Sequence, residues 1–195
     1  MRLLYVDCCI SIHARSRTKL LADTFLNAWK NQHPDWSIET VDLKVHPLLP
    51  LEEGTLAERE QAAEEGRMDA PCLALARQFA QSDRIVMAAP FWEMSFPSML
   101  RVYIEHISVR GVTFLYTPQG PSGICRAKKM LYLTTAGGSL EHINFGNAYL
   151  RQLCQFYGIG EYHFIGADRQ DILEVDHEIF LHEALKKAEK LAQTF

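Results

Sequence analysis

The feature that most constrains the fold of this chain is a regular alternation of short apolar runs with stretches whose apolar residues recur at helical spacing. Runs that are continuously apolar, or alternate in the second case, predict strands at 3–8, 37–42, 84–89, 129–135 and 161–165. Helical spacing predicts helices at 18–32, from Pro97 to Ile107, at 145–157, and through Leu181, Leu185, Ala188 and Ala192. Continuous apolar runs are typical of strands that are covered on both faces.

Strands that alternate with helices are joined by right-handed crossovers, so the sequence predicts an α/β protein with an open parallel sheet between two helical layers. Five strands favour the flavodoxin-like order 2-1-3-4-5 over the six-stranded dinucleotide-binding order. We expect a single domain over residues 1–195. Two stretches depart from the alternation: an acidic, helix-prone excursion at about 51–69 and a hairpin or loop insertion at about 111–128.

Charge and cysteine content exclude several classes of protein. The chain has 20 Lys and Arg against 24 Asp and Glu, a formal net charge of -4, and its cations are scattered, so we expect no nucleic-acid partner. Its five cysteines are odd in number and include no C-x-x-C pair, which indicates reduced thiols and a cytoplasmic location. Asp7 interrupts the first apolar run, and no run is long enough to cross a bilayer, so we expect neither a signal peptide nor membrane association.

Ligands of open parallel sheets bind at the carboxyl ends of the strands, so the candidate site comprises three loops. These loops are residues 9–18, 90–96 and 136–139. The first loop lacks both G-x-G-x-x-G and a Walker lysine, which argues against a dinucleotide or ATP site. Ser16, Arg17 and Thr18 stand at a helix start, where they would hold a phosphate monoester, assisted by Arg15 or Arg17. The alternative is an ordinary N-cap with an arginine that faces solvent.

The second and third loops have compositions that suit a ring system. The second places large flat or polarizable side chains at a strand end, where a solvated turn is normally polar. These side chains are Phe91, Trp92, Met94 and Phe96. The alternative is that they cover a core edge or form a subunit contact. In the third loop, Thr134, Thr135, Gly137 and Gly138 would let backbone amides approach the polar edge of a heterocycle, although a Gly-Gly pair is more often simply a turn.

Three longer segments together resemble the flavodoxin-like NAD(P)H:quinone oxidoreductase and FMN-dependent azoreductase family. They are residues 89–100 (APFWEMSFPSML), residues 111–117 (GVTFLYT) with Gly120, Pro121 and Gly123, and residues 134–138 (TTAGG). The resemblance covers most of the chain. The Gly-Val-Thr-Phe segment is the diagnostic part, and it favours the azoreductase branch over the short electron-carrier flavodoxins.

The resemblance implies an FMN cofactor at the strand ends. By position in the family motifs, the phosphate would lie against Ser16, Arg17 and Thr18, near Cys9. The isoalloxazine would lie beside Pro90, Phe91, Trp92, Glu93 and Met94, with its pyrimidine side near Thr135, Gly137 and Gly138.

The resemblance also implies an activity and an assembly. Such enzymes accept electrons from NADH or NADPH and pass them to quinones, azo compounds or similar small acceptors, by ping-pong two-electron (hydride) transfer through the flavin. They are homodimers whose flavin pockets lie at the interface, where a residue such as Tyr116 or Phe114 contributes to the substrate cavity. No side chain is assigned as a general acid. Tyr116 and His142 are the candidates, and an exposed loop histidine is the simpler interpretation of His142.

Two residues depart from the family pattern. Cys9 replaces a serine near the phosphate by a weaker donor. Glu93 stands where relatives commonly have asparagine, and a carboxylate beside the ring would oppose the negative charge of a reduced flavin. Either its side chain points away and only its backbone contacts the ring, or the flavin potential and the substrate range are unusual. We expect the first.

Two alternative functions stay open. The first is an electron-transfer flavoprotein that docks a protein partner, and the second is a flavodoxin-like binding or regulatory module that has lost flavin, for which Cys9 and Glu93 supply the motive. A separate cluster of Asp176, His177, Glu178, His182 and Glu183 resembles a metal centre at first sight. No H-E-x-x-H pattern is present and the two histidines are five residues apart, so we expect a solvated helix face and no metal.

Overall fold

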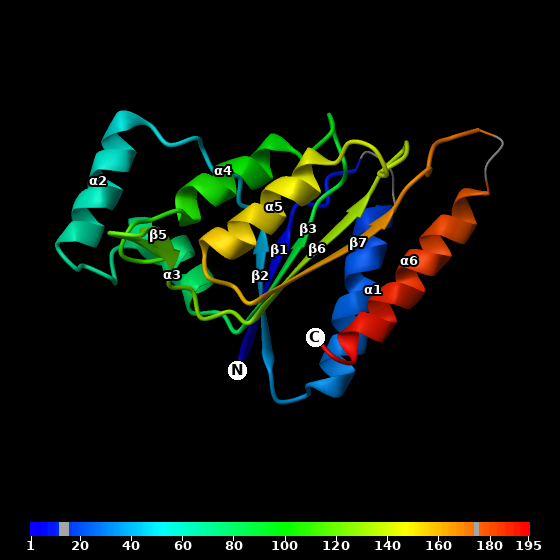
Figure 1. Cartoon of the computed structure of the whole chain (residues 1–195), viewed down its shortest axis with the longest axis horizontal. Coiled ribbons are helices and arrows are strands. Elements are labelled where there is room, and N and C mark those ends of the chain that lie inside the picture. Colours follow the sequence, from blue (N-terminus) through cyan, green and yellow to red (C-terminus); the bar gives the residue numbers. More distant parts are fainter. Residues whose placement is uncertain (12–15, 174–175) are drawn as a thin grey trace.

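The computed structural model describes residues 1–11, 16–173 and 176–195, and its centre is a five-stranded parallel sheet (Figure 1). The strands are β1 (Arg2–Asp7), β2 (Ser37–Asp42), β3 (Arg84–Ala88), β6 (Lys129–Thr135) and β7 (Glu161–Ala167). They lie in the order β2-β1-β3-β6-β7. This confirms the predicted order 2-1-3-4-5, because β4 and β5 form a separate hairpin and shift the numbering.

Helices cover both faces of the sheet (Figure 1). On one face lie α1 (Arg17–Gln32) and α6 (His177–Ala192). On the other lie α3 (Ala74–Ala80), α4 (Ser98–Ile107) and α5 (Phe145–Phe156). Because successive side chains of a strand point to opposite faces, each strand supplies both layers of the core. The consecutive Cys8 and Cys9 accordingly belong to different core clusters.

One helix of the crossover between β2 and β3 was missed by the sequence analysis. This helix, α3, follows a short 3-10 helix at Pro71–Leu73. It has only 7 residues, too few for helical spacing to be recognised, and it is held by burial of Ala76 and Phe79.

The two irregular stretches contain regular elements. Helix α2 (Glu53–Glu64) lies within the 51–69 excursion and is tied to the rest of the chain by Arg59, whose buried guanidinium donates to the Glu105 carbonyl at 2.7 Å. The 111–128 stretch contains the antiparallel strands β4 (Phe114–Thr117) and β5 (Gly120–Gly123). Among the described residues, no helix combines the length and apolarity needed to cross a membrane.

The hairpin packs on the end of α5 through a contact between glycines. A Cβ at Gly123 would overlap the backbone of Tyr157 and Gly158. Gly158 has a φ of 74°, a left-handed conformation that glycine adopts without strain. The Cys125 N–H donates to the Tyr157 carbonyl at 3.1 Å beside this contact. The hairpin therefore requires glycine at position 123.

We expect Gly123→Ala to destabilise the protein by about 2 kcal/mol or more, because the methyl group meets backbone atoms that cannot rotate away. Urea unfolding followed by circular dichroism measures the change. Gly54→Ala is the matched control, since a Cβ at this position of α2 meets nothing within 4 Å. Equal stability of the Gly123→Ala variant and the wild type would contradict the packing described here.

Candidate functional site

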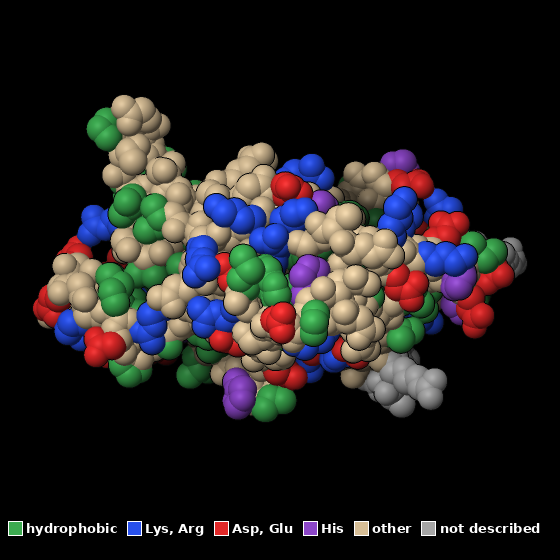
Figure 2. All heavy atoms as spheres, turned by 90° about the horizontal axis from the view of Figure 1, so that it is seen from below, with side chains coloured by type: hydrophobic (Ala, Val, Ile, Leu, Met, Phe, Trp, Pro, Cys, Tyr) green, Lys and Arg blue, Asp and Glu red, His purple; other side chains and the backbone are tan. Residues whose placement is uncertain are grey.

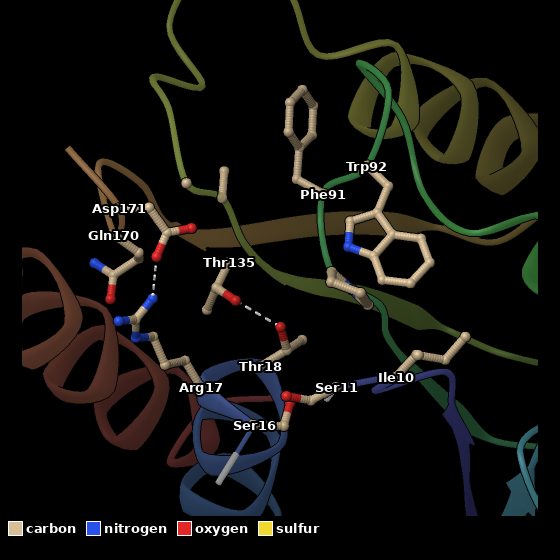
Figure 3. Close-up of a pocket in the computed structure, with 13 residues that line it drawn as sticks. Ile10, Ser11, Ser16, Arg17, Thr18, Phe91, Trp92, Thr135, Gln170 and Asp171 are labelled. Atoms are coloured by element: carbon tan, nitrogen blue, oxygen red, sulfur yellow. Dashed lines mark hydrogen bonds and ion pairs between the residues drawn. The ribbon is translucent and has the colours of Figure 1, made fainter. Parts of the chain in front are cut away.

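The loops after β1, β3 and β6 converge on one hollow at the carboxyl edge of the sheet (Figure 3). Its volume is about 490 Å³, within the range of roughly 300–1,000 Å³ typical of small-molecule sites. The lining residues are Ile10, Ser11, Ser16, Arg17, Thr18, Pro90, Phe91, Trp92, Thr135, Ala136, Gly137, Gln170 and Asp171. The hollow thus brings together eight of the residues proposed to bind the cofactor, namely Ser16, Arg17, Thr18, Pro90, Phe91, Trp92, Thr135 and Gly137.

The first turn of α1 forms one wall. Ser16 is the N-cap, and its Oγ accepts a hydrogen bond from the Lys19 N–H at 3.2 Å, so it caps the helix and lines the hollow at the same time. The buried Thr18 hydroxyl lies 2.6 Å from the Thr135 hydroxyl, which joins α1 to the end of β6. Arg17 Nη1 lies 2.8 Å from Asp171 Oδ1. Arg15, the other proposed phosphate ligand, falls outside the described residues.

The loop after β3 supplies aromatic side chains and a tight turn. Phe91 and Trp92 line the hollow, and the Phe91 N–H donates to the Thr135 carbonyl at 2.9 Å. Trp92 and Ser95 exchange backbone hydrogen bonds of 3.1 and 2.8 Å around the two residues between them. Those residues, Glu93 and Met94, have φ values of 49° and 65°, a left-handed conformation that costs non-glycine residues energy.

This turn directs its side chains outward. Glu93 and Met94 are exposed and do not line the hollow. The Met94 carbonyl accepts a hydrogen bond from the Phe145 N–H at 2.9 Å, which fixes the turn against the start of α5. A carboxylate that faces solvent keeps its charge away from whatever occupies the hollow.

A fourth loop, which follows β7, completes the hollow and was missed by the sequence analysis. Gln170 and Asp171 come from this loop, and its backbone pairs with the loop after β6 through three hydrogen bonds. They run from Arg169 N–H to the Gly138 carbonyl, from Gln170 N–H to Ala136, and from Asp171 N–H to Gly137. The rule that ligands bind at carboxyl strand ends applies equally to the fifth strand and would have pointed to these residues.

Gln170 presents an unsatisfied acceptor next to the hollow. The residue is 2% exposed, and its Nε2 donates to the carbonyls of Asp168 and His177 at 2.9 and 3.1 Å. Its Oε1 has no hydrogen-bond partner among the residues that the structure describes. A buried acceptor without a donor is costly.

Other proposed residues do not line the hollow. Cys9 is buried, with its Sγ 3.7 Å from the Ala88 carbonyl, and burial raises the pKa of its thiol far above the usual value, so the thiol stays neutral. Gly138 and His142 are exposed in the loop after β6 and are not among the lining residues of the hollow. Tyr116 is 69% exposed on β4, and Figure 1 shows the hairpin away from the carboxyl ends of the strands.

In the described ranges, no three His, Cys, Asp or Glu side chains gather as a metal ion requires. His177 and His182 are both exposed on α6.

The fold and the edge-of-sheet hollow define a class of protein. The chain belongs to the flavodoxin-like fold family, whose sequence profile matches residues 1–192. It is similar to FMN-dependent NADH:quinone oxidoreductase 2 of Clostridium acetobutylicum, with 35% identity over 100% of this chain and 99% of that one. It is also 33% identical to the FMN-dependent NADH:quinone oxidoreductase of Caldicellulosiruptor saccharolyticus, with the same coverage.

Solved structures show the same fold. The azoreductase from Bacillus anthracis has a TM-score of 0.89 and 23% identity, with 100% of this chain and 99% of that one covered. An FMN-dependent NADH-azoreductase of that species, in complex with FMN, has a TM-score of 0.82 and 21% identity, with 98% of each chain covered. At these identities the likeness shows the fold alone.

We expect Thr18→Val to lower the free energy of unfolding by about 1–3 kcal/mol, because the Thr135 hydroxyl loses its buried partner. Thr24→Val in the same helix is the control, since the Thr24 hydroxyl bonds only the Leu20 carbonyl at an exposed position. Urea unfolding of both variants provides the comparison. If the two substitutions cost the same, the bond to Thr135 does not join α1 to β6 as described.

Proposed function

We propose that this protein is an FMN-dependent NADH oxidoreductase that reduces quinones, azo compounds or similar small acceptors. The observation that carries the proposal is the hollow, whose two ends match the two ends of a flavin mononucleotide. One end has hydroxyls and a guanidinium at a helix start, and the other has exposed aromatic surface. The relatives at 33–35% identity are named as FMN-dependent NADH:quinone oxidoreductases over the full length of this chain.

The residues present fit FMN. Ser16, Arg17 and Thr18 would hold the phosphate, since unpaired N–H groups and the positive end of α1 favour an anion there. Phe91 and Trp92 would flank the ring, with Thr135 and Gly137 near its polar edge. The free acceptor of Gln170 suits a hydroxyl of the ribityl chain. We keep five further residues as proposed neighbours of the cofactor, although their side chains do not need to touch it. They are Cys9, Pro90, Glu93, Met94 and Gly138.

Bound FMN supplies the two-electron chemistry that connects NADH to the acceptor. The chain positions the cofactor and limits access of water to it. The turn at Glu93 and Met94 is bonded to the start of α5 through the Met94 carbonyl, and the exposed Glu93 side chain would keep its negative charge away from the ring. Neither Tyr116 nor His142 is among the described residues that line the hollow.

We further infer a homodimer. Exposed apolar side chains surround the aromatic end of the hollow, and a second copy would bury them; they are Trp92, Met94, Ile143 and Phe145. Tyr116 of the partner is a better candidate than Phe114 for the substrate cavity, because Phe114 is buried against Phe156 in its own chain. Free thiols at all five cysteines support a reducing, cytoplasmic location.

We expect NADH to bleach the visible absorption of the FMN-loaded protein under anaerobic conditions, and a quinone added next to restore it. Stopped-flow spectroscopy measures both phases, and NADPH in place of NADH gives the donor preference. Dithionite is the control for a reducible flavin. Reduction by dithionite but by neither nucleotide would exclude the oxidoreductase and favour an electron carrier, whereas failure to take up FMN would favour a module without flavin.

A further inference from the structure

An ion pair spans the end of the hollow where the phosphate is proposed to bind. Arg17 is the first residue of α1, and Asp171 lies 154 residues later in the loop after β7, with Nη1 and Oδ1 2.8 Å apart (Figure 3). Their side chains are 40% and 71% exposed. The pair is therefore accessible to a ligand that enters the hollow.

Arg17 and Asp171 are the only charged side chains among the described lining residues. Their charges cancel, so the one cation among these described residues is already engaged by a carboxylate. A phosphate dianion at the start of α1 would attract Arg17 and repel Asp171.

The two partners differ in how freely they can move. The Asp171 N–H donates to the Gly137 carbonyl at 3.1 Å. Its neighbour Gln170 is buried and donates to the Asp168 carbonyl in the same loop and to the His177 carbonyl at the start of α6. The carboxylate also occupies space that Gly137 leaves free, because a Cβ there would lie 2.6 Å from Asp171 Oδ2. Arg17 reaches the pair through a long flexible side chain, so Arg17 is the partner that can turn toward a ligand.

We propose that Asp171 competes with the phosphate of the bound mononucleotide for Arg17, and thereby limits how much the phosphate contributes to flavin affinity. This inference rests on the proposed function, because it assumes a flavin phosphate at the start of α1. It makes Asp171 a residue that sets the preference for FMN over the uncharged riboflavin. Removal of its charge strengthens the binding of FMN and leaves the binding of riboflavin unchanged.

The test compares the dissociation constants of FMN and of riboflavin, measured by flavin fluorescence, for the wild type and for Asp171→Asn, Arg17→Gln and the double variant. We expect Asp171→Asn to bind FMN about threefold to tenfold more tightly, the effect of one partly exposed charge on a dianion. Riboflavin affinity is expected to stay within about twofold. Arg17→Gln weakens FMN binding more in the Asp171→Asn background than in the wild type, because the arginine is then free to bind the phosphate.

The control for net charge is Asp35→Asn, an exposed carboxylate after the carboxyl end of α1. FMN affinity that is unchanged or lower in Asp171→Asn overturns the competition, and a lower value would mean that Asp171 holds Arg17 in place for the phosphate. A parallel rise in FMN and riboflavin affinity also overturns it. If the wild type binds neither flavin, the proposed function fails, and the inference fails with it.

Discussion

Parallel pairing in a common register is the constraint on which the site depends. Asp7 pairs with Ala88, Ala88 with Leu133, and Leu133 with Ile165, so four strands end close to one level. The loops that follow them must therefore leave the sheet at the same edge. Residues from four distant parts of the sequence line a single hollow for this reason.

The hollow is polar at one end and aromatic at the other. Among the described residues of the polar end, the hydroxyls of Ser16, Thr18 and Thr135 and the Arg17 guanidinium gather at the start of α1, and Asp171 balances the guanidinium. N–H groups and the helix dipole would support the binding of an anion there, with Arg17 shared between the anion and Asp171. An ion pair that is exposed contributes little to folding.

The residues that do not reach the hollow are also informative. The β4–β5 hairpin, with Tyr116, lies away from the carboxyl edge in the same chain, while exposed apolar side chains surround the aromatic rim. A site whose proposed substrate contacts lie on opposite parts of one chain is consistent with assembly from two copies, as we infer for this protein. The strained turn at Glu93 and Met94 belongs to the loop that such a partner would meet. A hydrogen bond from the Phe145 N–H to the Met94 carbonyl joins this turn to the start of α5.

The sequence by itself determined the strands, their order, and the three loops at the carboxyl edge, because continuous apolar runs and helical spacing are local properties. It also indicated the paired hydroxyls and aromatic side chains of the hollow. Helix α3 was too short to be recognised, and the roles of Gln170 and Asp171 depend on contacts with residues far away in the chain. Only the tertiary structure decided that the Cys9 thiol is buried toward Ala88 and that Arg17 meets Asp171. The physical reason is that side-chain direction follows from the register of the sheet and the conformation of each turn, and long-range pairs exist only after those are set.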